Sequence, residues 1–276
     1  SEAVAAFANV DVTCPAGTFT TLSSSDEITW TATFTPTADT EDATNTCDIA
    51  ASYTDTAGNT GPTGSSANYA VDTISPTVTT NSMNDVALKA GDTATLTLVF
   101  SQAVSAFANV DVTCPAGSLS TLSSGDSITW TATFTPTADT DDDANTCDVA
   151  TSYTDVSGNA GAASSSANYE VETQAPSASS ITMSDTTLIE GETATLTIVF
   201  SETVAGFASN DDVSCATGSL AVMAITSGST WAGTFTPTAE NTALTNVCTL
   251  GTGYTDTAGN AGPADTTANY IVDGVD

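Results

Sequence analysis

The sequence repeats itself three times with a period close to 100 residues, and this repetition constrains the fold more than any other feature. Trp30 and Trp130 are 100 positions apart, and Trp231 follows 101 positions later. The extra residue lies in SNDDVSC (209–215), where the second copy reads ANVDVTC (108–114). Because short solenoid repeats have periods of roughly 20–50 residues, a period of this size favours a row of globular domains.

Each copy alternates apolar and polar residues in the way expected of β-strands with one buried face. In TATLTLVF (93–100) alanine, leucine and phenylalanine face one side and threonine faces the other. ITWTATFTP (128–136) has the same pattern and ends at a proline, which cannot donate to a strand ladder. The second copy contains about seven such segments, strands A to G, near 75–81, 93–101, 107–114, 118–122, 127–135, 146–153 and 167–172. This pattern predicts an all-β chain of tandem Greek-key Ig-like β-sandwich domains.

The repeat predicts domains at residues 1–73, 74–173 and 174–276. By alignment with the second copy, residues 1–73 hold strands C to G and lack strands A and B. Strand B carries four inward apolar residues, and burying each large one is worth roughly 1.5–3 kcal/mol, so a unit without it exposes a groove. The expected partners are further repeats of the same array or copies of the chain, with strand complementation of residues 1–73 by another chain or by a missing segment.

Six cysteines fall into three pairs with equal spacing of 33 residues. Each repeat holds one pair: Cys14 and Cys47, Cys114 and Cys147, Cys215 and Cys248. A metal site would need neighbouring cysteine or histidine ligands, but there is no C-x-x-C motif and no histidine. We therefore predict one disulfide per repeat, an extracellular location, and roughly 3–4 kcal/mol of stabilisation from each closed loop.

The charge balance excludes several classes of function. The chain has 33 acidic residues, one basic residue (Lys89) and a net charge of −32 at pH 7. Nucleic acids and anionic membranes both require a positive surface, and no apolar run approaches the ~20 residues that span a membrane. Without histidine there is no Ser–His or Cys–His couple, and three similar units offer no unique cleft for a carboxylate pair. We predict that the protein is not an enzyme, not a nucleic-acid binder and not inserted in a membrane.

Three sets of motifs carry a resemblance to a known family. They are TATLTLVFSQAV and TATLTIVFSETV, WTATFTPTA and WAGTFTPTA, and the pair YTDTAGN and YTDVSGN. These segments resemble the bacterial Ig-like repeats of giant secreted adhesins and extracellular surface fibres. The resemblance implies a long extracellular stalk, often stiffened by calcium at the domain junctions. One departure is the cysteine pair in every copy, because such arrays are commonly poor in cysteine.

Two acidic groups are candidates for binding Ca²⁺, which takes 6–8 oxygen ligands. One lies between strands E and F and comprises Asp39, Glu41 and Asp42 in the first copy, Asp139 and Asp141 to Asp143 in the second, and Glu240 in the third. The other is the motif D-x-x-G-N between strands F and G, with Asp55 and Asn59, Asp155 and Asn159, and Asp256 and Asn260. Both also have an ordinary interpretation, the first as a solvated loop and the second as a turn stabilised by Asp, Asn and Gly.

Topology favours the D-x-x-G-N motif as the calcium ligand. Successive antiparallel strands alternate in direction, so the F–G turn of one domain faces the end of strand G in the domain before it. That strand ends in an acid, Asp72 in the first copy and Glu172 in the second. We expect the following groups to meet: Asp72 with Asp155 and Asn159, and Glu172 with Asp256 and Asn260. Carboxylates brought together repel one another unless a cation lies between them, so the sequence predicts Ca²⁺ at each junction.

The leading interpretation is a non-enzymatic extracellular structural protein that forms a stiff stalk, a filament or a surface layer. The linkers TISPT (73–77) and TQAPS (173–177) agree with stiffness, because they are short and contain proline. The alternative is a binding module for a glycan, ice or a host surface. The third copy is the place to look for it, because that copy diverges most at ATGSLAVMAITSGSTWAG (216–233).

Overall fold

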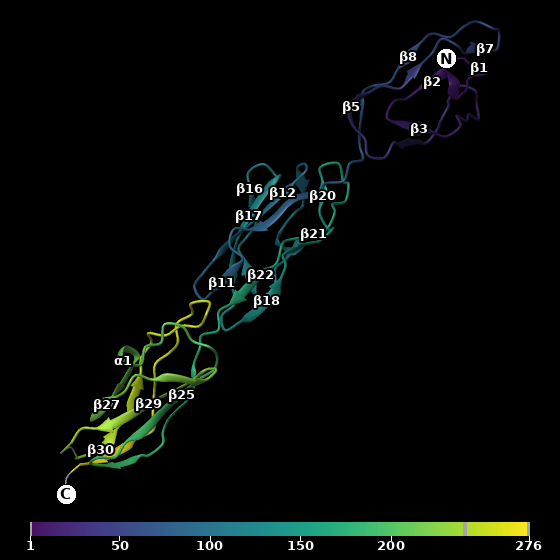
Figure 1. Ribbon diagram of the computed structural model, residues 1–276. Helices are drawn as coiled ribbons and strands as arrows, with labels where there is room; N and C mark the ends of the chain where they lie inside the picture. Colours follow the sequence, from purple (N-terminus) through teal and green to yellow (C-terminus); the bar gives the residue numbers. More distant parts are fainter. Residues whose placement is uncertain (1, 240–241, 275–276) are drawn as a thin grey trace.

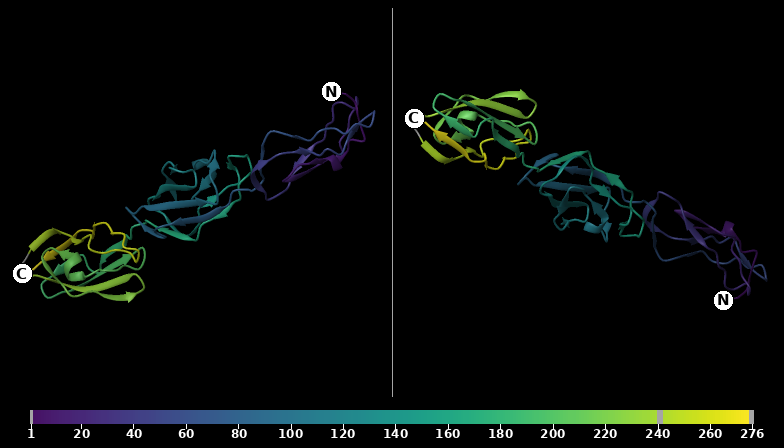
Figure 2. Two further views of the ribbon diagram at one scale, coloured as in Figure 1. Left: turned by 90° about the horizontal axis from the view of Figure 1, so that it is seen from above. Right: turned by 90° about the horizontal axis from the view of Figure 1, so that it is seen from below.

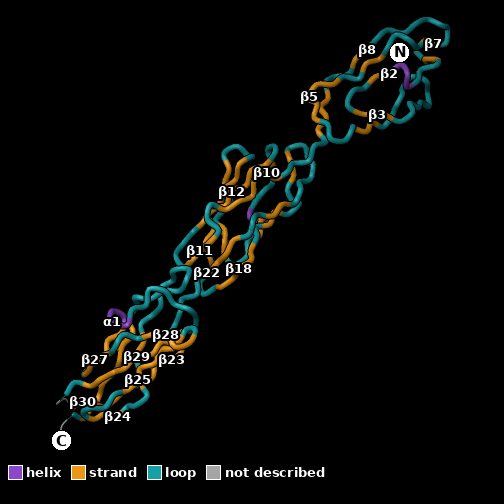
Figure 3. The backbone as a smooth tube through the Cα atoms, viewed as in Figure 1, coloured by secondary structure: helices purple, strands orange, loops and turns teal. Residues whose placement is uncertain are grey.

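The computed structural model describes residues 2–239 and 242–274, and it has three β-sandwich modules arranged end to end (Figure 1). We call them module 1 (up to residue 73), module 2 (74–173) and module 3 (from residue 174). The amino and carboxyl ends lie at opposite ends of this row in all views (Figures 1 and 2). The all-β prediction is confirmed, since strands and loops make up almost all of the backbone in Figure 3.

Module 2 is a sandwich of two groups of strands. The first sheet has the order β10-β12-β17-β15, and β16 also pairs with β17. The opposite side is built from the orders β11-β22-β18 and β14-β19-β21, with β13 pairing β20. The strands are β10 (Val78–Met83), β11 (Ala87–Lys89), β12 (Ala94–Phe100), β13 (Val104–Ser105), β14 (Val112–Thr113), β15 (Gly117–Leu119), β16 (Ser123–Ser124), β17 (Thr129–Pro136), β18 (Asp141–Asn145), β19 (Asp148–Val149), β20 (Thr154–Asp155), β21 (Ser164–Ser165) and β22 (Tyr169–Glu172). This division is that of Ig-like sandwiches, with the predicted strands A, B, D and E in one sheet and C, F and G in the other.

Module 3 repeats the same arrangement, and β24 runs parallel to β33 as β11 does to β22. Its elements are β23 (Ala178–Met183), β24 (Thr187–Ile189), β25 (Ala194–Phe200), α1 (Ser209–Asp212), β26 (Val213–Cys215), β27 (Gly218–Leu220), β28 (Ala224–Ser227), β29 (Thr230–Pro237), β30 (Thr242–Asn246), β31 (Cys248–Leu250), β32 (Asp265–Thr266) and β33 (Tyr270–Asp273). The single α-helical turn arises from the extra residue of the third copy, because modules 1 and 2 have shorter 3-10 turns there, at Asn9–Asp11 and Asn109–Asp111.

Module 1 contains the counterparts of β13 to β22 except β16, whose place is taken by an isolated bridge between Ser23 and Thr31. Its strands are β1 (Val4–Ala5), β2 (Val12–Thr13), β3 (Gly17–Phe19), β4 (Phe34–Pro36), β5 (Glu41–Asn45), β6 (Asp48–Ile49), β7 (Thr54–Asp55), β8 (Gly64–Ser65) and β9 (Tyr69–Asp72). Within the described part of module 1, no strand takes the place of β10 or β12. Its apolar side chains are therefore less covered than those of the other modules: Tyr53 and Phe34 are only partly buried, whereas Tyr153 and Phe134 are fully buried.

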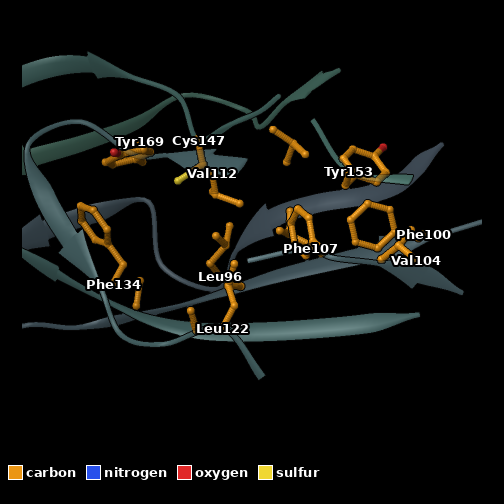
Figure 4. Close-up of a cluster of buried hydrophobic side chains, with 14 of the residues drawn as sticks. Leu96, Phe100, Val104, Phe107, Val112, Leu122, Phe134, Cys147, Tyr153 and Tyr169 are labelled. Carbon is orange, nitrogen blue, oxygen red and sulfur yellow. The ribbon is translucent and has the colours of Figure 1, made fainter. Parts of the chain in front are cut away.

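The alternation predicted for strand B is confirmed in module 2. Leu96, Leu98 and Phe100 of β12 are at most 2% exposed, while the intervening threonines lie on the outer face. At one end of the core Phe100 meets the rings of Phe107 and Tyr153 edge-on, with centroids 4.9 Å and 5.0 Å away (Figure 4). These contacts join the two sides of the sandwich.

All three predicted disulfides are present, linking Cys14 to Cys47, Cys114 to Cys147 and Cys215 to Cys248. In module 2 the bond connects the segment after β14 with the segment between β18 and β19. Cys147 and Cys248 are fully buried, so the disulfide is part of the hydrophobic core in modules 2 and 3.

Among the acids between strands E and F, Asp39 and Asp139 lie in a turn, as the loop interpretation predicts, but the acids at 41–42 and 141–143 do not, and that part of the sequence interpretation is wrong. Glu41–Asn45 and Asp141–Asn145 form strands β5 and β18, which pair with β9 and β22. An edge strand tolerates outward acids, and the buried Asn145 stabilises this one by donating to the carbonyls of Asp142 (3.0 Å) and Tyr169 (3.3 Å). Glu240, the corresponding acid of the third copy, lies outside the described residues.

Gly117 tests how tightly this core is packed. A β-carbon added there would lie 2.2 Å from the Phe134 ring and 2.6 Å from the Thr135 carbonyl oxygen. We expect Gly117→Ala to lower the free energy of unfolding of module 2 by about 1–3 kcal/mol, as overpacking does. Gly125→Ala is the matched control, because no atom lies within 4 Å of its added carbon. Urea unfolding of both variants checks this, and equal losses would contradict it.

Candidate functional site: the junctions between modules

The first linker is anchored on both sides. Thr73 donates its backbone N–H to the carbonyl of Thr40 at 2.8 Å, which fixes the start of the linker to module 1. Thr77 exchanges two hydrogen bonds with Ser101 of module 2: its N–H donates to Oγ at 3.0 Å, and its carbonyl accepts from the Ser101 N–H at 2.8 Å. Only residues 74–76 lie between these anchors, and Pro76 is buried.

The second linker repeats this pattern. The Thr173 N–H donates to the Thr140 carbonyl at 2.7 Å. Ser177 and Ser201 exchange the same pair of hydrogen bonds, at 3.0 Å and 2.8 Å. Since each linker is bonded to the modules on both sides, neither has the freedom of an extended tether.

The D-x-x-G-N motif forms a closed turn in every module. In module 2 one oxygen of Asp155 accepts the backbone N–H groups of Ser157 and Asn159, both at 2.9 Å. The other accepts the Asn159 side-chain amide at 2.8 Å. Gly158 has a φ of +94°, which only glycine adopts readily. Burial opposes ionisation of Asp155, but the hydrogen bonds from Asn159, Ser157 and Gly158 outweigh it and lower the pKa of the carboxyl.

At the first junction this turn contacts the end of β9, as the topology predicts. The Asn159 amide donates to the backbone carbonyl of Asp72 at 3.1 Å and to its carboxylate at 3.4 Å. A second amide completes the junction, since Gln102 Nε2 donates to the Ile74 carbonyl at 3.0 Å and to Asp155 at 2.7 Å. Gln102 is not among the residues predicted from the sequence, although the difference between SQAV and SETV in the aligned copies marks this position.

At the second junction two separate segments of module 2, at Ala90 and at Glu172, contact Asn260 of module 3. The Asn260 amide donates to the Glu172 carbonyl at 2.8 Å, and its Oδ1 accepts the Ala90 N–H at 2.8 Å. Asn260 is 3% exposed, so both contacts are shielded from water. The chain's one basic side chain is also here, because Lys89 Nζ lies 3.2 Å from the position that a β-carbon on Gly259 would occupy.

The two junctions differ in charge at one position. Glu202 occupies in module 3 the place that Gln102 has in module 2, so an amide donor is replaced by a carboxyl. Burial, together with the carboxylates of Asp256, Glu172 and Asp141, raises the pKa of Glu202. Burial, together with the carboxylates of Asp141, Asp256 and Asp143, likewise raises the pKa of Glu172. The second junction therefore holds two carboxyl groups, Glu172 and Glu202, whose ionisation is opposed by neighbouring acids.

The predicted calcium ligands are only partly brought together. Asp72 meets Asn159, and Glu172 meets Asn260, whereas in the described part of the chain the side-chain hydrogen bonds of Asp55 and Asn59 stay within their own turn. Within residues 2–239 and 242–274, no three histidine, cysteine, aspartate or glutamate side chains form a group able to hold a metal ion. At the first junction four N–H donors already occupy the Asp155 oxygens, so these residues fit hydrogen bonds better than a cation.

Comparison with known families identifies the repeat. The model of the bacterial Ig-like domain matches residues 1–71, 72–171 and 172–272. The chain belongs to this family. None of the curated proteins matches this Ig-like chain.

Several solved structures are similar to these Ig-like modules at low identity. FdeC, an adhesin of Escherichia coli, is 14% identical with a TM-score of 0.38, covering 99% of this chain and 85% of that one. Invasin, a bacterial integrin-binding protein, is 13% identical with a TM-score of 0.34, covering 87% and 48%. The bacterial S-layer protein SbsC is 15% identical with a TM-score of 0.25, covering 72% and 44%. With TM-scores below 0.5, these similarities assign no function.

The second Ig-like junction can be tested by cleavage after Lys89, the chain's one site for a lysine-specific protease. The Ala90 N–H is bound by Asn260, so cleavage requires this contact to open. We expect Asn260→Ala to raise the cleavage rate about tenfold, which corresponds to losing a hydrogen bond worth about 1.4 kcal/mol.

Two variants serve as controls for that experiment. Asn59→Ala removes the same bond within its turn, 2.7 Å from Asn59 to Asp55, but touches no other module among the described residues. Asn159→Ala opens the first junction instead of the second. Neither should change cleavage at Lys89 by more than twofold, and a similar rise in either would contradict an inter-module role for Asn260.

Replacing Glu202 by Gln should strengthen the second junction at neutral pH. A carboxyl whose pKa is raised in the folded state destabilises that state when ionised, so the cost is present above the folded pKa and disappears below the unfolded one. Glu202→Gln should therefore stabilise module 3 by about 1 kcal/mol at pH 7, the net value of a hydrogen bond like that of Gln102. Thermal unfolding at pH 7 and pH 4 checks this, because the gain should shrink on acidification. A constant gain would contradict the role of charge.

Proposed function

We propose that this chain is an extracellular, non-enzymatic structural protein whose modules form a stiff rod, serving as a stalk, a filament or a surface layer. The observation that carries the proposal is the anchoring of both linkers, with hydrogen bonds to the modules on either side of residues 74–76 and 174–176. The modules follow one another end to end in both views of Figure 2. A row of this kind extends the reach of the chain along one direction.

The disulfides of the chain support an extracellular location. Disulfides persist in oxidising compartments, and each module carries one. The excess of acids favours solubility, and the family is that of bacterial Ig-like domains. Among the described residues, no helix has the length and apolar character needed to cross a membrane.

Calcium stiffening stays part of the proposal, and the second junction is its better location. There the Asp256 carboxylate opposes the ionisation of both Glu172 and Glu202, and a divalent cation would relieve that repulsion. Carboxylate oxygens are the ligands that Ca²⁺ prefers. At the first junction the amides of Gln102 and Asn159 already serve this purpose.

A binding role in module 3 is the second candidate, and one observation favours it. Val222 is 78% exposed and Ile225, on β28, is 58% exposed. The corresponding residues of module 2 are Thr121 and Ser124, so module 3 alone has an apolar edge here. Exposed apolar side chains that cluster at one place are typical of contact surfaces for a partner, such as a glycan or a host receptor.

Small-angle X-ray scattering of the full chain tests the rod. We expect the profile of a single extended particle, and a shorter and broader distribution of distances for the double variant Gln102→Ala with Asn159→Ala. Asn59→Ala should leave the profile unchanged. A flexible-chain profile for the unmodified protein would overturn the rod proposal.

Calcium is tested separately by calorimetric titration and by melting with Ca²⁺ or EDTA. We expect binding and a raised melting temperature of module 3, both lost in Glu202→Gln. No heat and no shift with EDTA would remove calcium from the proposal and leave the hydrogen-bonded rod unaffected.

A further inference from the structure

One sheet of module 3 ends in an open strand, β28, that is longer than its counterparts in the other modules. It pairs with β29 on one side, and within the described residues no strand pairs with its other side. All four residues of β28 are exposed. In module 2 the corresponding β16 has two residues, and in module 1 a single bridge between Ser23 and Thr31 takes its place. An open edge of this kind presents backbone groups that another strand can pair with.

Modules 1 and 2 protect this edge with an acid. In module 2 Asp126 Oδ1 accepts the backbone N–H groups of Ile128 at 2.9 Å and Thr129 at 2.8 Å. The hydrogen bonds from Thr129 and Ile128 lower the pKa of the Asp126 carboxyl, so it is ionised at neutral pH. Asp26 makes the same two contacts in module 1, at 3.0 Å and 2.7 Å. A charge beside a short edge strand is one way in which proteins prevent their edges from pairing.

Module 3 lacks this protection. Ser227 stands at the position of Asp126, and Ile225, which is 58% exposed, stands at the position of Ser124. A two-residue turn at Gly228–Ser229 joins β28 directly to β29, and Gly228 has the positive φ, +50°, that such a turn requires. The edge is therefore longer, uncharged and more apolar in the third module alone.

The charge of the surrounding sequence indicates which partner fits this edge. No charged residue lies between Asp212 and Glu240, and this is the longest such stretch in the chain. Two copies of a chain with a net charge of −32 repel each other over most of their surfaces, so they can meet only where both lack charge. A cationic partner would instead be attracted to the acidic surfaces elsewhere. The edge of module 3 therefore suits a second copy of the same chain.

The geometry of β28 allows it to pair with itself. A two-fold axis places the same strand of both copies side by side and antiparallel, and two-fold symmetry is the commonest arrangement in dimers. An axis through the middle of this four-residue strand brings Ile225 of one copy next to Ile225 of the other. Ile225 pairs in register with Trp231, which packs against the core of module 3. The two isoleucines would thus form an apolar cross-strand contact between the two cores.

We propose that two copies of this chain join side by side through antiparallel pairing of their β28 strands. The paired strands form one continuous sheet across both copies of module 3, with the two Ile225 side chains in contact at its centre. This inference rests on the second candidate function, a binding role for module 3, and it names a second copy as the partner. It depends neither on calcium nor on the stiffness of the rod.

Sedimentation velocity of the full chain in EDTA tests whether this dimer forms. The fraction of dimer should grow with protein concentration, and EDTA removes any bridging by calcium. Dimers should also become more abundant when the salt concentration rises from ~0.1 M to ~1 M, because the screening length falls from about 10 Å to about 3 Å and the repulsion between acids weakens. A chain that stays monomeric at millimolar concentration in high salt would overturn the proposal.

Two substitutions that add the same charge to exposed apolar positions assign the interface. Ile225→Glu should raise the dissociation constant of the dimer more than tenfold. Val10→Glu, at a residue that is 86% exposed on the 3-10 turn of module 1, should change it less than twofold. Melting curves of both variants check that they fold. Equal effects on the dimer would show that β28 is not the interface.

Restoring the acid of the other modules tests the role of charge at this edge. Ser227→Asp places a carboxylate where module 2 has Asp126, and it should weaken the dimer more than tenfold. Ser227→Asn is the matched control, because it adds a side chain of nearly the same shape without charge, and it should change the dissociation constant less than twofold. Ser227 is exposed, so both variants are expected to fold. The same loss in both would contradict the proposal, since charge is the reason for choosing a second copy.

Amide hydrogen exchange distinguishes a second copy from another partner. Dimerisation should slow exchange within residues 224–227 at least fivefold, with no effect in Ile225→Glu. If the chain stays monomeric and these amides are protected only by an added oligosaccharide, the second copy is overturned while the binding role of module 3 stands. If neither protects them, both are overturned, and the scattering test of the rod is unaffected.

Discussion

The burial of one strand face closes each sandwich, and the rest of the molecule depends on it. In modules 2 and 3 the apolar side of β12 or β25 inserts between the sheets and brings the aromatic rings of both sides into contact. Each of these large side chains contributes roughly 1.5–3 kcal/mol, so the strand supplies a substantial part of the stability of a domain of 100 residues. Where this face is missing, the same flanking sequence gives shorter strands and half-covered rings.

Stability inside a module also determines geometry between modules. Ser101 and Ser201 directly follow β12 and β25, and both hold the linker that precedes their module. The turn that contacts the preceding module begins at the last residue of β20, Asp155, which is 2% exposed. A junction built from the ends of core strands is as rigid as those strands, because its hydrogen-bond donors and acceptors cannot move independently of the core.

Much of this arrangement follows from sequence patterns that depend on local chemistry. The alternation of apolar and polar residues predicts β12 and β17, and the equal spacing of the cysteines predicts their pairing. The alternating direction of successive strands predicts the contact between Asn159 and Asp72. The sequence interpretation was wrong about residues 141–145, because acids are poor strand formers in isolation and only pairing with β22 makes them a strand. It also missed the fourth donor to Asp155, since Gln102 is 53 residues away in the chain.

The position of each disulfide has a mechanical consequence. Tension along the row enters a module at its first strand and leaves at its last, while the bond between Cys114 and Cys147 closes the 33-residue segment between them. At about 3.3–3.6 Å per extended residue, that loop withholds about 110 Å of contour length from a module that is pulled open. A module unfolded by force would therefore lengthen by about one third less than it would without the disulfide. The bond would also keep β14 close to β19 while the module refolds.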